Sequence, residues 1–204
     1  MTYLAMIHPT ACIDQLFRHF QGGKEPIGIT YRPTMFGNSV SIGAGAIIGL
    51  GVVLEDAVVI DHQCIVEPNT TIGRNSLLIY RAIIGGEAVI GNDCVIGGFI
   101  AERSIVGARC RVFGQLVHRQ ADTTLSWDEH DLPEPSAQIG DDSFIGFGAI
   151  IVGGVTIGPK AYVCAGAIVT KSVPPGHIAL GVNQIVPSNE WRGKLADNPV
   201  FSNG

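Results

Sequence analysis

Aliphatic residues recur at every sixth position over most of the chain. Beginning at Ile42, ten successive positions in steps of six are isoleucine, leucine or valine: Ile42, Ile48, Leu54, Ile60, Val66, Ile72, Leu78, Ile84, Ile90 and Ile96. The phase then shifts once, to Ile100, Val106 and Val112, and after an interruption the repeat resumes from Ile139 to Val169. Neither the period of about 3.6 residues of an α-helix nor the alternation of a long strand produces this pattern. The repeat predicts a solenoid of short stacked units.

A second column of small residues supports the same interpretation. The position two residues before each aliphatic anchor usually holds a small side chain, as at Ala46, Cys64 and Ser76. Residues two apart on a strand face the same side, so each short strand turns one large and one small residue inward. Glycine often follows the anchor and precedes asparagine or aspartate, which tolerate the positive φ of tight corners. Three strands and three corners make a coil of about 18 residues, and the counts predict about six to seven coils of a parallel β-helix.

The chain is expected to form one all-β domain, with the coils covering about two thirds of it. The expected parts are an N-terminal partial coil with an insertion (1–30), a first stack of coils (31–118), a loop excursion (119–138), closing coils (139–175) and a tail (176–204). Two prolines in the segment 173–176 remove backbone donors and fix φ, so the coils are expected to end there.

Composition and charge exclude several classes of partner. The chain has 46% hydrophobic residues and a net charge of −5, and lysine and arginine do not cluster, so a nucleic-acid partner is not expected. No apolar run approaches the roughly 18 residues of a membrane span, and the N-terminus does not resemble a signal peptide. The five cysteines are widely spaced without a CxxC motif, which favours a reduced, cytoplasmic protein. Cys64, Cys94, Cys110 and Cys164 are expected to be packing residues.

The stretch 139–181, IGDDSFIGFGAIIVGGVTIGPKAYVCAGAIVTKSVPPGHIALG, closely matches the pattern that ends the coils of the hexapeptide-repeat acyltransferases. The chain resembles this family, in particular the galactoside and maltose O-acetyltransferases and the sugar N-acetyltransferases. The resemblance implies a left-handed winding of the coils and a homotrimer with sites between neighbouring subunits. It also implies acetyl-CoA as the acyl donor, a small-molecule acceptor and no metal. The acceptor, and whether it is a hydroxyl or an amine, stay open.

The resemblance also implies a catalytic histidine at the start of the excursion. Related enzymes carry one about twenty residues before the "IG" that restarts the coils, and His118 stands 21 residues before Ile139. His118 is also expected to occupy the next anchor position, six residues after Val112. Acyl transfer needs a base that works near neutral pH, and imidazole has an ordinary pKa of about 6.5. His118 is therefore the expected general base, with His130 as the alternative.

An acceptor on the other ring nitrogen of His118 should fix its tautomer. Glu134 is the expected acidic partner, with Glu129 and Asp128 as alternatives in the same excursion. The resemblance assigns the coenzyme to residues of the closing coils, namely Phe147, Ala165, Thr170 and Lys171. Phe147 replaces a small polar residue of the family, and the segment 182–187 replaces its Pro-Ala-Lys or Pro-Ala-Arg, so the adenine end is expected to be held differently.

Two other functions fit the same coils. A zinc enzyme similar to the γ-class carbonic anhydrases needs three converging histidines, and His62, His118 and His130 lack the close spacing that such sites commonly show. A non-catalytic β-solenoid scaffold is the second alternative. Metal content tests the first alternative, and a titration with acetyl-CoA tests the second, because a scaffold shows no saturable binding.

Overall fold

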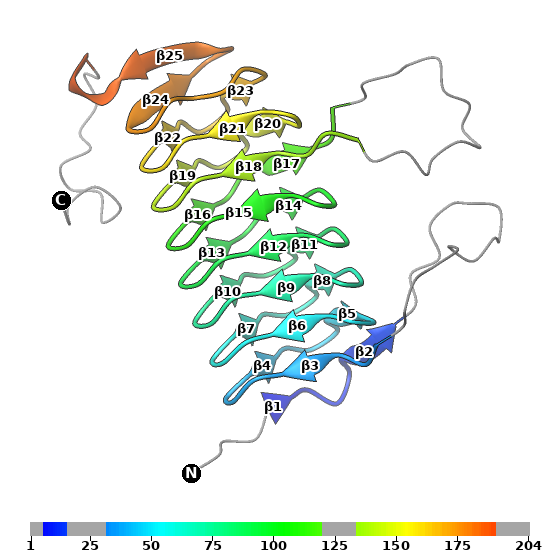
Figure 1. Cartoon of the computed structure of the whole chain (residues 1–204). Coiled ribbons are helices and arrows are strands. Elements are labelled where there is room, and N and C mark those ends of the chain that lie inside the picture. Colours follow the sequence, from blue (N-terminus) through cyan, green and yellow to red (C-terminus); the bar gives the residue numbers. More distant parts are fainter. Residues whose placement is uncertain (1–5, 16–31, 120–133, 191–204) are drawn as a thin grey trace, which may run out of the picture.

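The computed structural model describes residues 6–15, 32–119 and 134–190 as a three-sided stack of short strands (Figure 1). Its three sides are β-sheets, which we call sheets A, B and C. The chain passes from sheet A to sheet B, to sheet C and back to sheet A, and each circuit makes one coil. Strands of successive coils pair in parallel within each sheet. The solenoid has about seven turns and matches the left-handed β-helix that was predicted.

Most strands contain only two residues. Sheet A contains β1 (Met6–Ile7), β4 (Ser41–Ile42), β7 (Val59–Ile60), β10 (Leu77–Leu78), β13 (Val95–Ile96), β16 (Arg111–Val112), β19 (Phe144–Ile145), β22 (Tyr162–Val163), β24 (His177–Leu180) and β25 (Gln184–Pro187). Sheet B contains β2 (Cys12–Gln15), β5 (Ile47–Gly49), β8 (Ile65–Val66), β11 (Ile83–Ile84), β14 (Phe99–Ile100), β17 (Gln115–Val117), β20 (Ile150–Val152) and β23 (Ile168–Val169). Sheet C contains β3 (Met35–Phe36), β6 (Val53–Leu54), β9 (Thr71–Ile72), β12 (Val89–Ile90), β15 (Ile105–Val106), β18 (Gln138–Ile139) and β21 (Thr156–Ile157). The 3-10 helix η1 (Ser188–Glu190) follows β25. Within the described residues, no helix has the length and apolar character that a bilayer-spanning segment requires.

The interior consists of the two predicted columns. The aliphatic anchors from Ile42 to Val169 are at most 3% exposed, and small residues such as Ala46 and Ala161 are fully buried beside them. Polar members of the small column bond to the main chain, as when Thr70 Oγ1 donates to the carbonyl oxygen of Gly85 at 3.0 Å. Each fully buried aliphatic side chain contributes about 1.5–3 kcal/mol, so the column of anchors supplies much of the folding free energy.

The phase of the repeat shifts twice in the structure, not once. After Val112 the next buried anchor is Leu116, which is 0% exposed and pairs with Ile100 of the preceding coil. His118 is half-buried and lies just beyond β17. The expectation that His118 occupies an anchor position is therefore wrong, because the corner before β17 is two residues shorter than the sequence pattern assumed.

Both shifts occur at two-residue corners between sheets A and B, at Gly97–Gly98 and at Phe113–Gly114. These corners stack directly on one another, since a Cβ added to Gly98 would overlap the carbonyl oxygen of Gly114. The close approach of the two backbones requires glycine at this point. The shortened corners change which residues of the following coils face inward.

Ordinary corners place one residue in the left-handed region of φ. The residues in this conformation include Glu87, with φ of 58°, and Lys160, with φ of 56°, as well as the asparagines and aspartates that the sequence suggested. Their main-chain N–H groups donate to the coil before, from Glu87 to the Pro68 carbonyl oxygen (3.0 Å) and from Lys160 to that of Asp141 (2.9 Å). A left-handed residue costs about 1–2 kcal/mol, and a net hydrogen bond returns about 0.5–1.5 kcal/mol. The hydrogen bonds between stacked corners therefore allow glutamate and lysine to adopt this conformation, which an isolated turn would disfavour.

Two strands follow the proline-containing segment 173–176. β24 pairs in parallel with β22 and extends sheet A, and β25 folds back antiparallel on β24. Between them, Val182 makes an isolated parallel bridge with Ile168 of sheet B. Part of the segment assigned to the tail thus adds a further partial coil at the C-terminal end of the stack.

Candidate functional site

Corners of successive coils stack into columns, which we call edges. The A–B edge connects sheet A to sheet B, and the B–C edge connects sheet B to sheet C. The predicted excursion, residues 119–138, leaves the B–C edge after β17 and returns to it at β18. The excursion therefore interrupts one edge of an otherwise continuous stack, and the predicted base stands where it leaves.

Main-chain hydrogen bonds hold together the two ends of the excursion, where the chain leaves the coils and returns to them. Arg119 N donates to the Pro135 carbonyl oxygen at 3.3 Å, which joins the departing and returning segments. From the next coil, Gly153 N donates to the Val117 carbonyl oxygen at 2.7 Å. A Cβ on Gly153 would overlap the carbonyl oxygen of Pro135, so this corner must be glycine to fit against the returning chain. The backbone on both sides of His118 is consequently fixed.

His118 is half-buried and contacts a residue from the far side of the excursion. Its Nδ1 lies 3.4 Å from Ser136 Oγ, and that hydroxyl donates to the main-chain carbonyl oxygen of Glu102 at 2.6 Å. Ser136 was not singled out in the sequence, because nothing near it in the chain marks it and its partners lie 18 and 34 residues away. A half-buried, positioned imidazole is suited to moving a proton between a bound reactant and itself.

Glu134 lies beside this cluster and contributes its main chain to it. Its carbonyl oxygen is 3.4 Å from Ser136 Oγ, and among the described residues its carboxylate makes no hydrogen bond to His118. The other candidates of the excursion, His130, Glu129 and Asp128, lie outside the described residues. The role of Glu134 as acidic partner stays a prediction.

Thr170 and Lys171 lie on the same edge as His118. They follow β23, which is two strands from β17 in sheet B, a separation of about 10 Å at the usual strand spacing. Both side chains are exposed. Thr170 is held by Asn183, whose Oδ1 accepts from Thr170 N and whose Nδ2 donates to Thr170 Oγ1, both at 2.7 Å. Asn183 belongs to the segment that departs from the family pattern, so here that segment binds the predicted coenzyme residue.

Phe147 and Ala165 lie together on the other edge of sheet B. They occupy successive corners of the A–B edge, where Gly166 N donates to the Phe147 carbonyl oxygen at 3.0 Å. Phe147 is 80% exposed, an unusual state for an aromatic side chain. The four predicted coenzyme residues therefore fall into two pairs, one on each edge of sheet B.

Three of the five cysteines are packing residues by position, whereas Cys12 is exposed and Cys164 is half-buried. Cys64, Cys94 and Cys110 are fully buried. Burial raises the pKa of the Cys64 and Cys164 thiols, which disfavours the reactive thiolate. Across the ranges 6–15, 32–119 and 134–190, no three histidine, cysteine or acidic side chains come together as a possible metal site.

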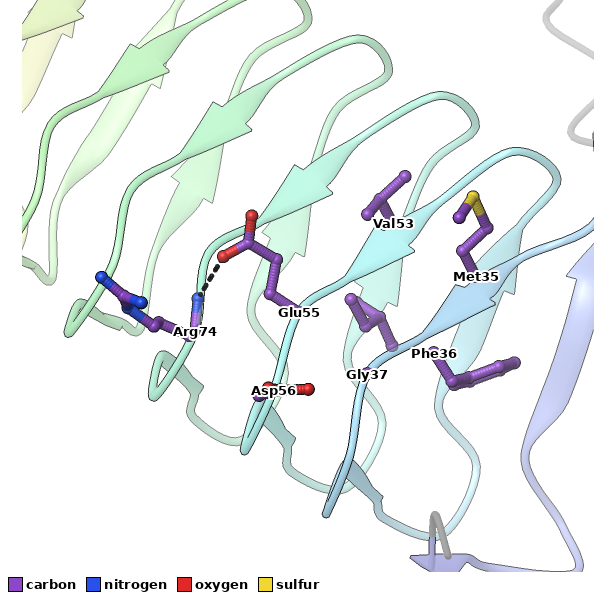
Figure 2. Close-up of a pocket in the computed structure, with 8 residues that line it drawn as sticks. Met35, Phe36, Gly37, Val53, Glu55, Asp56 and Arg74 are labelled. Atoms are coloured by element: carbon purple, nitrogen blue, oxygen red, sulfur yellow. Dashed lines mark hydrogen bonds between the residues drawn. The ribbon is translucent and has the colours of Figure 1, made fainter. Parts of the chain in front are cut away.

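A hollow of about 340 Å³ lies on the first coils, away from the excursion (Figure 2). It is lined by Met35, Phe36, Gly37, Val53, Leu54, Glu55, Asp56 and Arg74. Within it, Glu55 Oε2 accepts from Arg74 N at 3.0 Å. None of the predicted site residues lines this hollow, so it is separate from the candidate site.

Comparison with known proteins supports the repeat on both sides of the excursion. Residues 136–171 match the family model described as bacterial transferase hexapeptide (six repeats), and residues 33–61 match the hexapeptide repeat of succinyl-transferase. The chain is a hexapeptide-repeat protein. In this hexapeptide-repeat protein, the first matched segment contains Ser136 and the four predicted coenzyme residues.

Individual relatives match short parts of the hexapeptide-repeat protein. A protein of Schizosaccharomyces pombe named as an acetyltransferase is 49% identical over 43 residues, 21% of each chain. The bifunctional protein GlmU of Agrobacterium fabrum is 38% identical over 58 residues, 28% of this chain and 12% of GlmU. The match thus spans 21% or less of these relatives. The acetyltransferase domain of PglB from Neisseria gonorrhoeae, with a TM-score of 0.52 and 19% identity over 64% of this chain and 57% of that one, shares the fold.

Proposed function

We propose that the protein is a coenzyme A-dependent acyltransferase. In this proposal, it moves an acetyl group from acetyl-CoA to a hydroxyl or amine of a sugar or another small acceptor. The observation that carries the proposal is the position of His118, held at the base of the excursion on the same edge as Thr170 and Lys171. The matched transferase repeats and the relative named as an acetyltransferase support the same reaction.

His118 acts as the general base in this reaction. It takes the proton of the acceptor hydroxyl or amine while the acceptor oxygen or nitrogen attacks the carbonyl carbon of the thioester. The tetrahedral intermediate collapses, the carbon–sulfur bond breaks, and the coenzyme thiolate leaves and receives the proton from the imidazolium. The charge of Glu134 is proposed to stabilise that imidazolium from the returning end of the excursion.

The donor site is proposed to be shared between subunits of a homotrimer. The exposed ammonium of Lys171 attracts the nucleotide phosphates, and Phe147 and Ala165 flank the pantetheine arm. These groups lie on opposite edges of sheet B, so one coenzyme meets both when the A–B edge of one subunit adjoins the B–C edge of the next. Repetition of such a head-to-tail contact closes a threefold ring. Sheet B then faces the ring axis.

The test is an acceptor screen with labelled acetyl-CoA over amino sugars, sugars and small amines, followed by the variant His118→Ala. Loss of the base should lower turnover by about 10²- to 10⁴-fold, about 3–5 kcal/mol of barrier, with the Kd for acetyl-CoA little changed. His177→Ala is the matched control, because His177 is half-buried like His118 and begins β24 in sheet A, away from both edges of sheet B.

Two results would contradict the proposal. Absence of saturable acetyl-CoA binding by the intact protein would favour the scaffold alternative. Equal losses of turnover and coenzyme affinity in His118→Ala would show that His118 supports the structure rather than the proton transfer.

A further inference from the structure

Ser136 connects three parts of the candidate site. Its Oγ donates to the Glu102 carbonyl oxygen at 2.6 Å and lies 3.4 Å from both the Glu134 carbonyl oxygen and His118 Nδ1. Its own carbonyl oxygen accepts from Gly154 N at 3.1 Å. The residue is therefore bonded to the coil before the excursion and to the coil after it, and its hydroxyl has a fixed position beside the imidazole.

The direction of the contact between Ser136 and His118 follows from proton counting. A serine hydroxyl has one proton to donate and two lone pairs to accept with. Both neighbouring carbonyl oxygens can only accept, and the short bond to Glu102 uses the single proton. Toward Nδ1 the hydroxyl can therefore only accept, so Nδ1 must carry a hydrogen for the contact to be a hydrogen bond. In a neutral imidazole, the proton on Nδ1 leaves Nε2 unprotonated.

We propose that Ser136 is a positioning residue that holds His118 in the tautomer with its proton on Nδ1. This leaves the Nε2 lone pair to accept the proton of the acceptor, so the catalytic consequence rests on the proposed function. The tautomer itself is a property of the folded chain. In this arrangement, the hydroxyl and the Glu102 carbonyl do the orienting that a carboxylate does in many histidine sites.

The tautomer is tested by long-range proton–nitrogen NMR of the intact, nitrogen-15-labelled protein at about pH 8.5, where imidazoles are neutral. The signals of His118 among the six histidines are assigned by their loss in His118→Gln. The expected spectrum has a protonated Nδ1 and a bare Nε2. In Ser136→Ala the acceptor is gone, and the populations should shift toward the Nε2-protonated form that histidine prefers in water. Ser136→Thr keeps the hydroxyl and should keep the native tautomer.

Ser172→Ala is the matched control. Its hydroxyl lies on the same B–C edge and accepts a hydrogen bond, from Thr156 N at 3.0 Å, but it makes no contact with His118. This variant should leave the His118 signals unchanged. In turnover assays, Ser136→Ala should lower kcat roughly tenfold with an unchanged KM for acetyl-CoA, and Ser136→Thr should restore it.

The two proposals fail in different measurements. A wild-type His118 protonated on Nε2, or a Ser136→Ala spectrum identical to wild type, overturns the role of Ser136 whatever the enzyme assay gives. The expected tautomer in a protein that acetylates no acceptor supports the hydrogen-bond assignment and counts against the proposed function. A change in kcat for Ser136→Ala that Ser136→Thr does not restore overturns the positioning role.

Discussion

At the scale of single residues, Leu116 and His118 show how strictly the interior of the solenoid selects its side chains. Leu116 is fully buried in the column of anchors. Two positions later, His118 is half-buried at the edge and bonded to a serine hydroxyl. The first residue serves stability, and the second is available for chemistry.

Truncation of these two side chains should therefore lower the free energy of unfolding by very different amounts. Leu116→Ala should lower the free energy of unfolding by about 2–5 kcal/mol, since it leaves a cavity in a close-packed column. His118→Ala should lower it by less than about 1 kcal/mol, because a half-exposed side chain with one long hydrogen bond is removed. Urea unfolding followed by circular dichroism measures both values. A decrease for His118→Ala as large as that for Leu116→Ala would indicate that His118 is buried in the column of anchors, and it would contradict the second phase shift.

At the scale of elements, corner length decides the phase of every following strand. The two-residue corners Gly97–Gly98 and Phe113–Gly114 each remove two residues from a coil while the strands of sheet B stay in register. The backbones of these two corners approach closely enough to exclude a side chain at Gly98. Corners of ordinary length instead admit large residues in the left-handed conformation, such as Lys160.

A methyl group at Gly98 tests this packing. Gly98→Ala forces the two short corners apart and should destabilise the protein by about 3 kcal/mol or more, the upper end of overpacking costs, because the added methyl group meets backbone rather than a flexible side chain. Gly148→Ala is the comparison, because Gly148 has φ of +68° and nothing within 4 Å of an added Cβ. It should cost only the conformational strain, about 1–2 kcal/mol. Equal small losses in thermal unfolding would mean that the short corners have room for a side chain.

The periodic part of the fold was predictable from the sequence, because each aliphatic anchor shows the phase of the six-residue repeat at its own position. The first shift was visible, since Ile100, Val106 and Val112 follow it at regular steps. The second shift was missed, because the excursion begins three residues after Leu116 and no further anchor marks the new phase. The glycine of Phe113–Gly114 was the available signal, since it repeats the pattern of Gly97–Gly98.

The candidate site was less predictable than the coils. His118 and the coenzyme residues entered through a family resemblance, and their roles stay proposals. Their grouping on two edges of sheet B depends on the number of residues in each corner. The contact with Ser136 joins residues separated by most of the excursion, and no local pattern in the chain encodes it.

At the scale of the whole molecule, sheet B presents a nearly continuous apolar row to the outside. The residues in register along it are Ile65, Ile83, Phe99, Gln115, Ile150 and Ile168. Polar residues interrupt the other two rows more often: Ser41 and Arg111 interrupt the otherwise mostly apolar row of sheet A, and Thr71, Gln138 and Thr156 interrupt that of sheet C. An apolar row of this kind is typical of a surface that packs against another chain.

The proposed trimer places this row at the ring axis, and a charge there should prevent assembly. Phe99→Glu buries an unpaired carboxylate at the interface, which costs several kcal/mol and should convert trimers to monomers in light scattering. Val59→Glu is the matched control, because Val59 is 38% exposed against 39% for Phe99 and begins a two-residue strand in sheet A. It should leave the trimer intact. Because the donor site is proposed to lie between subunits, Phe99→Glu should also abolish acetyl transfer. A Phe99→Glu protein that stays trimeric would contradict the proposal that sheet B faces the trimer axis.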